Sequence, residues 1–483
     1  MNVEPRRRDS WIVLGVALAL RAAVVVWAAS RFPPTADGSF YHRIAQRIAD
    51  GHGYTWLWPD GVVTFAAHYP VGYPALVGAA YALFGSHPGV AMALNAAIGS
   101  LAAVAVHRMA LRATTPRLAL VAGLLVAVHP GLVAYTPALM SEGVTASLVT
   151  CAAWAAACLR DASRDARLRA TWKWLVLLGF VVGAASLVRP QSIVFAPLFA
   201  FVAVAPWFGK SSWKRVVLAV ATATIATFVL VAPWTARNCA RMGSCALVSY
   251  NGGWNLLIGA DTASTGAWSP VKVPFECREV WDEAAKDECF GRAARRYIAQ
   301  NPTEWLALVP RKLAATFDYC GAAGWYLHES NGSACGDRCK VVLGGLETVY
   351  ERGVLLLALL WASKGSWRLS QLRRASVLSK AGLFVGLVGL VFLFQTHAWV
   401  SYVAFVLAAL LRGPELVRGP ILSSSAVIVV GMTAMIHAVF FGAGRYGMVT
   451  FPLLVGVAVL ALSPQRSEAG DVTQERVATP TVS

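Results

Sequence analysis

The stretch WIVLGVALALRAAVVVWAA, residues 11–29, decides the fold class of this chain. Its length is close to the roughly 20 residues with which an α-helix crosses a bilayer. Arg6, Arg7 and Arg8 precede it, and no clear small-residue cleavage site follows it. A signal peptide has a shorter apolar core and such a cleavage site. The stretch therefore predicts a first membrane-spanning helix.

Apolar runs of similar length recur along the whole chain. Hydrophobic residues make up 57% of the composition and charged residues 14%, whereas soluble domains carry about 25% charged residues. We expect an all-α polytopic membrane protein with about twelve spans, by the length that a bilayer requires. The expected spans are residues 11–30, 88–110, 117–135, 142–159, 173–188, 191–207, 215–235, 346–363, 380–395, 397–411, 421–441 and 447–463.

The distribution of Lys and Arg gives the expected orientation. With the N-terminus in the cytoplasm, basic residues gather in alternate short loops, as in 108–117, 160–173 and 364–380, and the short outside turns nearly lack them. This positive-inside pattern explains most of the net charge of +17. The positive charge therefore does not indicate nucleic-acid binding, and no nucleic-acid partner is expected. Residues 1–463 are expected to form one membrane domain, and residues 464–483 a disordered cytoplasmic tail.

Two expected outside loops are long, residues 31–87 and 236–345. In the first, FYHRIAQRIADG has apolar residues at helical spacing and predicts a helix over about 39–50 that lies in the membrane interface. A turn-rich aromatic stretch, GHGYTWLWPDG, follows it. HYPVGYPALVGAAYALFG then predicts a short apolar helix with Pro74 in its first turn, where no N–H is needed.

The second loop is rich in cysteine. It holds seven of the nine cysteines, and Asn331-Gly332-Ser333 within it fits a glycosylation acceptor. Cysteines clustered in an outside loop indicate disulfides formed in an oxidising compartment. A metal site is the alternative, although no paired CxxC occurs. Seven is an odd number, and the connectivity stays open, with Cys277 to Cys289 one pairing among others.

Cations at outside helix ends are exceptions to the charge pattern. Arg189, Arg237 and Arg445 all fall there. An arginine side chain presents a planar fork that suits phosphate, so these residues are candidates for binding a phosphate-bearing ligand. Taken singly, each arginine fits a lipid-headgroup or local-carboxylate contact at least as well. Taken together at one face, the three favour a ligand. Arg21, within the first span, should face the bundle interior and a partner, in a structural or a functional role.

Acidic residues at the same face offer acid–base chemistry. Asp37 lies in PPTADGSFYH and Glu142 in TPALMSEGV. One carboxylate would take a proton from an acceptor hydroxyl while the other orients the acceptor or a metal ion. The plainer alternatives are that Asp37 caps the helix starting near Ser39 and that Glu142 only complements its helix dipole. His68 either donates to an anionic oxygen or packs among aromatic rings.

The order of several short motifs resembles a known family. The chain is similar, over about residues 11–462, to GT-C-fold glycosyltransferases that use lipid-linked sugars. In particular it resembles the bacterial glycosyltransferase family 39 group, which is related to protein O-mannosyltransferases and the lipid A aminoarabinose transferase. The motifs are Asp37-Gly38 with Tyr41 and Ala45, Gly51-His52-Gly53-Tyr54, the run from His68 to Pro74, Ser141-Glu142, Arg189-Pro190, Pro233-Trp234 with Arg237-Asn238, Asn251-Gly252-Gly253 with Asn255-Leu256 and Gly259, and Arg445-Tyr446.

The resemblance implies transfer of a sugar from a polyprenyl-phosphate donor at the outer membrane face. Asp37 matches the proposed catalytic base, and Glu142 the second acidic position. The other site residues implied are His68, Arg189, Arg237 and Arg445 near the donor phosphate, and Tyr41, Tyr73, Tyr446 and Asn251 as substrate-binding residues. Membrane lipids are expected partners, and the acceptor, whether lipid, glycan or protein, is not identified. A bacterial inner membrane is the expected location, with the site facing the periplasm or the outside.

This chain departs from the family in three respects. The usual proline pair reads Pro70-Val71, the 236–345 loop is shorter and richer in cysteine than in some relatives, and no DxD pair lies near Asp37. A divalent metal stays open as a cofactor, but no DxD pair supports it, and no other cofactor is identified. A multi-span transporter or flippase is the main alternative, and a lipid-holding assembly factor another. The chain shows no convincing internal repeat of the kind transporters carry, and its polar candidates gather at one face.

Overall fold

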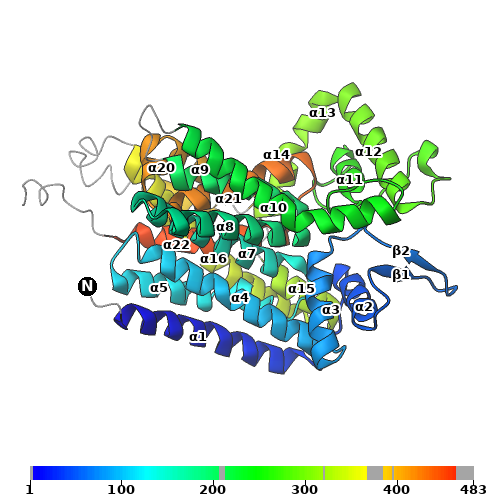
Figure 1. Cartoon of the computed structure of the whole chain (residues 1–483), viewed down its shortest axis with the longest axis horizontal. Helices are drawn as coiled ribbons and strands as arrows, with labels where there is room; N and C mark the ends of the chain where they lie inside the picture. Colours follow the sequence, from blue (N-terminus) through cyan, green and yellow to red (C-terminus); the bar gives the residue numbers. More distant parts are fainter. Residues whose placement is uncertain (1–3, 206–212, 319–320, 367–383, 394–395, 464–483) are drawn as a thin grey trace, which may run out of the picture.

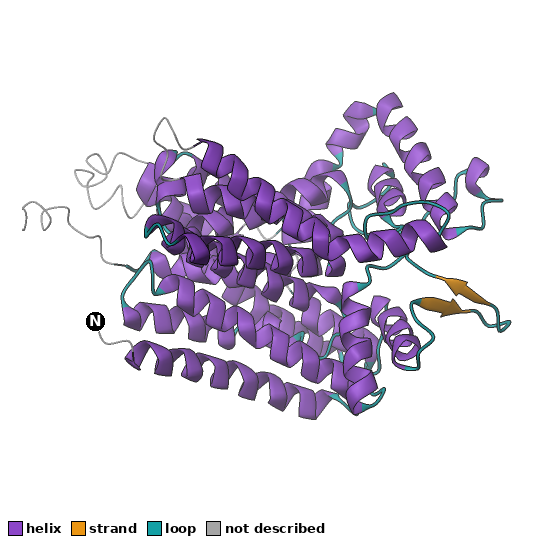
Figure 2. Ribbon diagram, in the orientation of Figure 1, coloured by secondary structure: helices purple, strands orange, loops and turns teal. Residues whose placement is uncertain are grey.

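A computed structural model describes residues 4–205, 213–318, 321–366, 384–393 and 396–463. Helices dominate it, and they lie side by side in an elongated bundle (Figures 1 and 2). The helices of the bundle are α1 (Glu4–Ala28), α4 (Pro88–Ala110), α5 (Pro116–Ala127), α6 (Pro130–Ala134), α7 (Ser141–Arg164), α8 (Leu168–Val188), η1 (Pro190–Val194), α9 (Phe195–Val204), α10 (Trp213–Arg241), α16 (Asp337–Ser366), η4 (Gly389–Leu393), α19 (Trp399–Leu410), α20 (Pro414–Arg418), α21 (Ile421–Val439), η5 (Gly444–Thr450) and α22 (Phe451–Leu460).

The expected fold class, an all-α polytopic membrane protein, is confirmed. Six helices in the described part are long and apolar enough to cross a bilayer: α1 from Arg7 onward, α4, α7, α8, α10 and α21. Shorter apolar helices occupy the expected spans near 117–135, 191–207, 397–411 and 447–463. The expected span 346–363 falls inside α16, and part of 380–395 lies outside the described residues, as do the 464–483 tail and most of the 364–380 loop.

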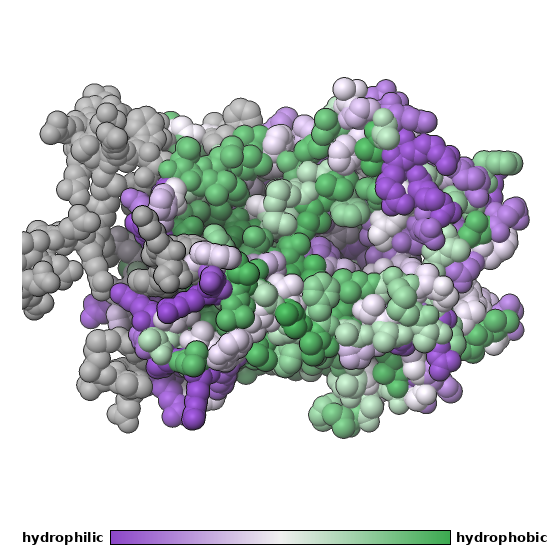
Figure 3. Space-filling view, turned by 45° about the horizontal axis from the view of Figure 1, so that its top comes forward, coloured by the Kyte–Doolittle hydropathy of each residue, from purple (hydrophilic) through white to green (hydrophobic). Residues whose placement is uncertain are grey.

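The bundle has two polar ends. Figure 3 shows an apolar belt between two ends where hydrophilic residues gather. The N-terminus lies at one end, together with α20, and α2, α3, the strands and α11–α13 lie at the other (Figure 1). The first group carries expected cytoplasmic loops and the second the expected outside loops, so the alternation read from the charges is reproduced in space.

Small residues bring the helices of the bundle close together. A Cβ on Gly179 of α8 would lie 2.5 Å from the Ala223 carbonyl oxygen of α10, so only glycine fits there. At the same crossing, the Thr227 hydroxyl donates to the Gly179 carbonyl over 2.9 Å. Helices in a membrane associate through such close backbone packing and interhelical hydrogen bonds, because the hydrophobic effect does not drive their association in lipid.

The first outside loop holds two helices and a hairpin. The helices are α2 (Asp37–Ala49) and α3 (Gly72–Phe84), which confirm the two helices expected there. The aromatic stretch between them forms the strands β1 (Thr55–Leu57) and β2 (Val63–Phe65), paired antiparallel with Trp56 opposite Thr64. This hairpin was not expected from the sequence. Its aromatic and β-branched residues suit a strand, and a turn through Gly61, with φ of 86°, joins the two strands.

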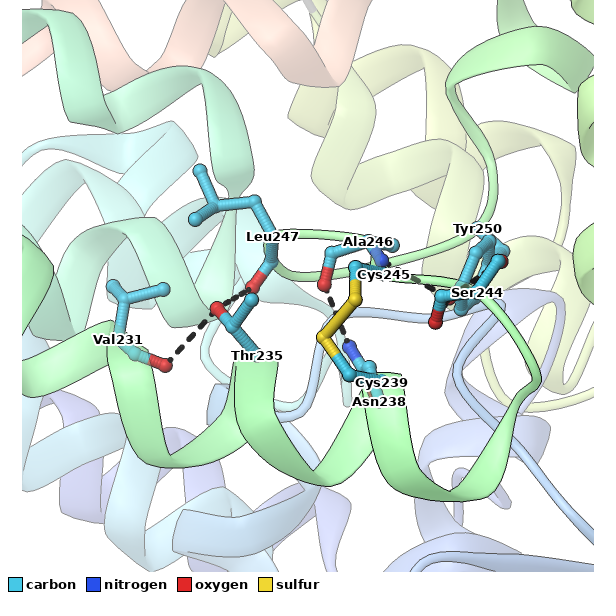
Figure 4. The surroundings of a disulfide bond; sticks show 9 residues. All are labelled: Val231, Thr235, Asn238, Cys239, Ser244, Cys245, Ala246, Leu247 and Tyr250. Carbon is cyan, nitrogen blue, oxygen red and sulfur yellow. Dashed lines mark hydrogen bonds between the residues drawn. A yellow bond between two sulfur atoms is a disulfide. The ribbon is translucent and has the colours of Figure 1, made fainter.

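The second outside loop begins on an extension of α10. This helix continues to Arg241, six residues past the expected end of the span at 235. Its last turn is tied to the following chain, because Asn238 donates to the Ala246 carbonyl over 3.1 Å and Thr235 to the Leu247 carbonyl over 2.7 Å (Figure 4). The loop then forms α11 (Gly252–Ala260), η3 (Phe275–Cys277), α12 (Glu283–Gln300), α13 (Pro302–Ala307), α14 (Val309–Phe317) and α15 (Ala322–Ser330).

Disulfides staple this second loop, as expected for an oxidising compartment. The pairs in the described residues are Cys239–Cys245, Cys277–Cys289 and Cys335–Cys339. The second of these is the pairing that sequence spacing left open. The seventh cysteine of the loop, Cys320, lies outside the described residues. Each bridge joins near neighbours along the chain, so each fixes a local turn and not the contact between distant elements.

The two outside loops pack on each other and on the last turn between spans. Glu283 of α12 accepts from the Trp56 indole at 3.0 Å and from the Ala67 amide at 2.6 Å. On the other side, the Gly442 amide donates to the Gly266 carbonyl over 2.8 Å. These contacts bring residues 31–87, 236–345 and 442–446 to one end of the bundle, where the candidate site lies.

Candidate active site

Asp37 stands at the first position of α2, at the end of the bundle that carries the two long loops. It follows Pro33 and Pro34, which hold the chain extended after α1. The residue before it, Ala36, is the N-cap and has φ of 49° and ψ of −134°, with no side-chain cap hydrogen bond. Asp37 is therefore not the cap of this helix, and its carboxylate is one-third exposed and turned to other partners.

Glu142 lies in the first turn of α7 and is almost completely buried, with 1% of its side chain exposed. Its carboxylate accepts two hydrogen bonds and makes one further ion-pair contact. Tyr135 donates its hydroxyl over 3.2 Å, Arg189 donates through Nη2, and the Arg445 Nε lies 3.1 Å away. Such partners offset the loss of hydration of a carboxylate that is buried this deeply. Glu142 also lies at the positive end of the α7 dipole, which favours a negative charge there. The plainer interpretation, that Glu142 complements its helix dipole, therefore describes only part of its surroundings.

Arg445 connects the two carboxylates. Its Nη2 donates to Asp37 Oδ2 over 2.8 Å, while its Nε faces Glu142. The planar fork of arginine lets one side chain face two acceptors in fixed directions. Asp37 and Arg445 are 408 residues apart in the chain, so the first outside loop and the turn before α22 meet here. This contact brings together three of the residues predicted from the sequence.

Arg189 completes the cluster. It precedes Pro190, which disfavours helical backbone at Arg189 and ends α8 at Val188. From this helix end its Nε donates to the Ser141 hydroxyl over 3.0 Å and its Nη2 to Glu142. Both Arg189 and Arg445 thus contact local carboxylates, one of the interpretations that the sequence left open. Their guanidinium groups also stack on the Tyr446 ring, at 4.7 and 5.4 Å from its centroid.

Two tyrosines complete the surroundings of Asp37. The Tyr69 hydroxyl donates to Asp37 Oδ1 over 3.3 Å. The Tyr41 ring packs edge-on against Tyr69, with the centroids 5.2 Å apart. Burial, with the negative charge of Asp37 adding to it, raises the pKa of both phenols above the ordinary value, so both stay neutral and able to donate. Sequence reasoning quoted Tyr69 in a motif but gave it no role, and it overlooked Tyr135.

The remaining predicted residues lie outside the group of ion pairs, although His68 and Tyr73 pack on the neighbouring rings of Tyr69 and Tyr41. His68 faces the Tyr250 carbonyl at 3.1 Å and packs against the Tyr69 and Trp254 rings, which fits the aromatic-packing interpretation. Tyr73 is buried and donates to Asn95 over 3.2 Å. Asn251 precedes α11 and accepts from Ser249 over 3.0 Å.

Arg237 also lies apart, and its fork is occupied by the backbone. It donates to the Ala66 carbonyl and to the Tyr54 carbonyl, both over 2.8 Å, and stacks on the Trp234 ring. These carbonyls flank the β1–β2 hairpin, so the contacts of Arg237 hold the hairpin to the end of α10. The sequence grouped it with Arg189 and Arg445 because all three end helices at one face, but its contacts indicate a structural role.

We expect Arg237→Ala to loosen the hairpin without weakening donor binding. Hydrogen–deuterium exchange should rise in residues 54–66, because two backbone carbonyls lose their donor. The affinity for polyprenyl phosphate should stay within about twofold of the wild type, well under the 1.4 kcal/mol of a tenfold change. Arg43→Ala is the control, since Arg43 is an exposed arginine on α2 in the same loop as the hairpin. A tenfold or greater loss of affinity with unchanged exchange would contradict this prediction and would show that Arg237 binds the donor phosphate.

Arg21 is buried in the first span, as expected. It has 1% exposure, and its Nη1 donates to the Ala17 and Ala127 carbonyls over 3.3 and 3.2 Å. The second contact ties α1 to the end of α5, which fits the structural interpretation of this residue. Among the described residues, no group of three or more His, Cys, Asp or Glu side chains is arranged to hold a metal ion.

Comparison with known proteins adds a family match to this geometry. The family model described as dolichyl-phosphate-mannose-protein mannosyltransferase matches residues 68–236. That segment contains Glu142 and Arg189, and it confirms the resemblance to protein O-mannosyltransferases for this part of the chain. A search of curated proteins finds no match.

Solved structures with a similar course of the chain were also found. One is the oligosaccharyltransferase AglB from Archaeoglobus fulgidus, in complex with an inhibitory peptide and a dolichol-phosphate, with a TM-score of 0.47, 16% identity, and coverage of 94% of this chain and 50% of that one. Another is ArnT from Cupriavidus metallidurans bound to undecaprenyl phosphate, with a TM-score of 0.39, 16% identity, and coverage of 93% and 76%. This chain spans about half the length of the oligosaccharyltransferase.

Proposed function

We propose that this chain transfers a sugar, a hexose or a pentose, from a polyprenyl-phosphate donor to an acceptor of the cell envelope. The reaction takes place at the extracytoplasmic face of a bacterial cytoplasmic membrane. The observation that carries the proposal is the contact of one arginine, Arg445, with the two carboxylates Asp37 and Glu142 at the end of the bundle. The family match over residues 68–236 supports the class of reaction.

The two arginines bind the phosphate of the donor in this proposal. Arg445 and Arg189 have 19% and 12% of their side chains exposed, so each keeps a small accessible part for a ligand. The Asp37 and Glu142 carboxylates occupy their forks in the free protein. A donor phosphate has the same charge-assisted hydrogen-bonding chemistry and competes with Asp37 for Arg445. Donor binding thereby releases the Asp37 carboxylate to act on the acceptor.

Asp37 acts as the general base. The acceptor hydroxyl attacks the anomeric carbon while the bond from this carbon to the phosphate oxygen breaks. The hydroxyl proton passes to Asp37, and the polyprenyl phosphate leaves with the bonding electron pair. The negative charge that builds on this phosphate strengthens its contacts with Arg445 and Arg189 in the transition state, which is how such contacts accelerate a reaction. A single displacement of this kind inverts the anomeric centre.

A row of aromatic rings supports binding of the sugar and acceptor beside Asp37. Phe40 stacks on Tyr69 with the centroids 5.5 Å apart, and Trp56 packs edge-on against Phe40 at 5.8 Å. On the other side of Tyr69, His68 packs against Trp254 at 5.6 Å. Aromatic side chains with a polar edge combine apolar contact area with hydrogen bonding, which suits the mixed surface of a sugar.

Purified protein in sealed proteoliposomes tests this proposal. The donors are polyprenyl-phosphate hexose and pentose labelled in the sugar, and the acceptors are envelope membranes from a strain that lacks the gene. We expect label in the acceptor and an equal amount of free polyprenyl phosphate. Movement of intact labelled donor across the vesicle without bond cleavage would instead identify a flippase. If the donor is neither cleaved nor moved across the membrane, the proposed transfer is contradicted, and the alternative of a lipid-holding assembly factor is favoured.

A further inference from the structure

We propose that Tyr326 in the second outside loop is a positioning residue that sets the separation of Asp37 and Glu142. The proposal deepens the proposed function and rests on it. Tyr326 lies on α15 with 1% of its surface exposed. Its hydroxyl oxygen accepts from two backbone amides, that of Thr35 over 3.4 Å and that of Leu139 over 3.3 Å. One amide lies two residues before Asp37, and the other three residues before Glu142.

The packing around this hydroxyl is too close to tolerate any side chain on the neighbouring glycine. A Cβ on Gly38 would lie 2.9 Å from the Tyr326 hydroxyl oxygen and 2.9 Å from the Leu139 carbonyl oxygen. The start of α2, the segment before α7 and the Tyr326 ring therefore meet at one point. Moving the Tyr326 hydroxyl moves both segments that carry the carboxylates.

The turn before Asp37 needs such a restraint. Ala36 has φ of 49° and ψ of −134°, a backbone conformation that residues other than glycine rarely adopt. Conformations of this kind cost about 1–3 kcal/mol and persist only where the surroundings hold them. The Thr35 amide bonded to Tyr326 is one restraint, and the Ser330 hydroxyl of α15, which donates to the Pro33 carbonyl, is another. Without them the turn would relax and carry Asp37 with it.

Tyr326 can act as a fixed reference because α15 is anchored on α16. The Cys335–Cys339 disulfide closes the connection between the two helices, and the His328 ring contacts the Cys335 carbonyl at 2.9 Å. A Cβ on Gly324 would lie 2.9 Å from the Lys340 carbonyl oxygen, so the helices are also in close contact. The cysteine-rich loop thus serves the reaction by holding one hydroxyl in place.

Tyr326→Phe tests the proposal, because it removes the acceptor oxygen and keeps the ring. Tyr350→Phe is the matched control: it removes a partly buried hydroxyl that donates to the Leu125 carbonyl over 2.7 Å, away from the site. We expect exchange of the Thr35 and Leu139 amides to rise in Tyr326→Phe and not in the control. We expect kcat to fall by about tenfold to a hundredfold with KM for the donor nearly unchanged, because small misplacements of reacting groups cost this much.

A second variant separates positioning from general damage. Ala36→Gly removes the cost of the unusual turn, so in the Tyr326→Phe background it should recover part of kcat. Unchanged exchange at Thr35 and Leu139 would overturn the proposal, and so would raised exchange with a wild-type kcat. If the wild type transfers no sugar, the proposed function fails, and the exchange measurement still decides whether Tyr326 holds the two segments.

Discussion

Asp37→Asn should abolish sugar transfer while the protein folds and inserts as the wild type does. The asparagine oxygen can still accept from Arg445, so the contact between the first loop and the turn before α22 survives. The variant cannot take the acceptor proton. A positioned general base contributes about 10²–10⁴-fold to a rate, and we expect a loss of this size in kcat for transfer from a polyprenyl-phosphate sugar.

The control for this prediction is Asp50→Asn. Asp50 follows the last residue of the same helix and is exposed, so it undergoes the same chemical change in the same loop. It should retain wild-type transfer. Binding of polyprenyl phosphate by Asp37→Asn should be equal to or tighter than that of the wild type, because Arg445 gives up a neutral partner more easily than a charged one. Wild-type turnover by Asp37→Asn would show that Asp37 is not the base.

Arg445→Ala should damage both the reaction and the fold. It removes a contact of the buried Glu142 and the ion-pair partner of Asp37. Removing one member of a buried ion pair costs about 3–5 kcal/mol, and Arg189 remains to offset part of this for Glu142. We expect a destabilisation of about 3 kcal/mol in thermal or denaturant unfolding of the purified protein, with transfer lost.

Arg445→Lys separates the two effects. Lysine keeps the positive charge but not the planar fork that faces both carboxylates. The variant should recover most of the stability and little of the transfer, and its affinity for polyprenyl phosphate should fall. Arg241→Lys, at an exposed position of the same face, should change none of these quantities. A fully active Arg445→Lys would mean that the fork does not contact the donor phosphate.

The helical class and the polar face could be predicted because the bilayer imposes strong patterns on sequence. Long apolar runs mark the spans, and the cation-poor loops mark the face on which Asp37, Glu142, Arg189 and Arg445 should meet. The structure brings these four side chains into contact with one another. That they share one binding pocket stays a prediction. Their individual roles in the reaction stay proposals.

The contacts of individual side chains could not be predicted, because they depend on the direction in which each side chain points. The sequence pattern indicates only at which membrane face a residue lies. Arg237 ends its helix at the same face as Arg189, yet its fork turns toward the β1–β2 hairpin, which the sequence did not reveal. Tyr326 carries no local signal, because its two amide donors lie 291 and 187 residues away in the chain. The disulfides join cysteines that are close together in the sequence. The sequence could not establish this connectivity, because the spacing of the cysteines allowed other pairings.

The anomeric configuration of the product tests most directly the central claim that Asp37, assisted by the arginine pair, drives one displacement at the donor sugar. The measurement is NMR of the sugar linkage in the product of a donor of known configuration, labelled with ¹³C at the anomeric carbon. The account predicts the opposite configuration in the product. Retention of the donor configuration would require a second displacement and would contradict the role given to Asp37.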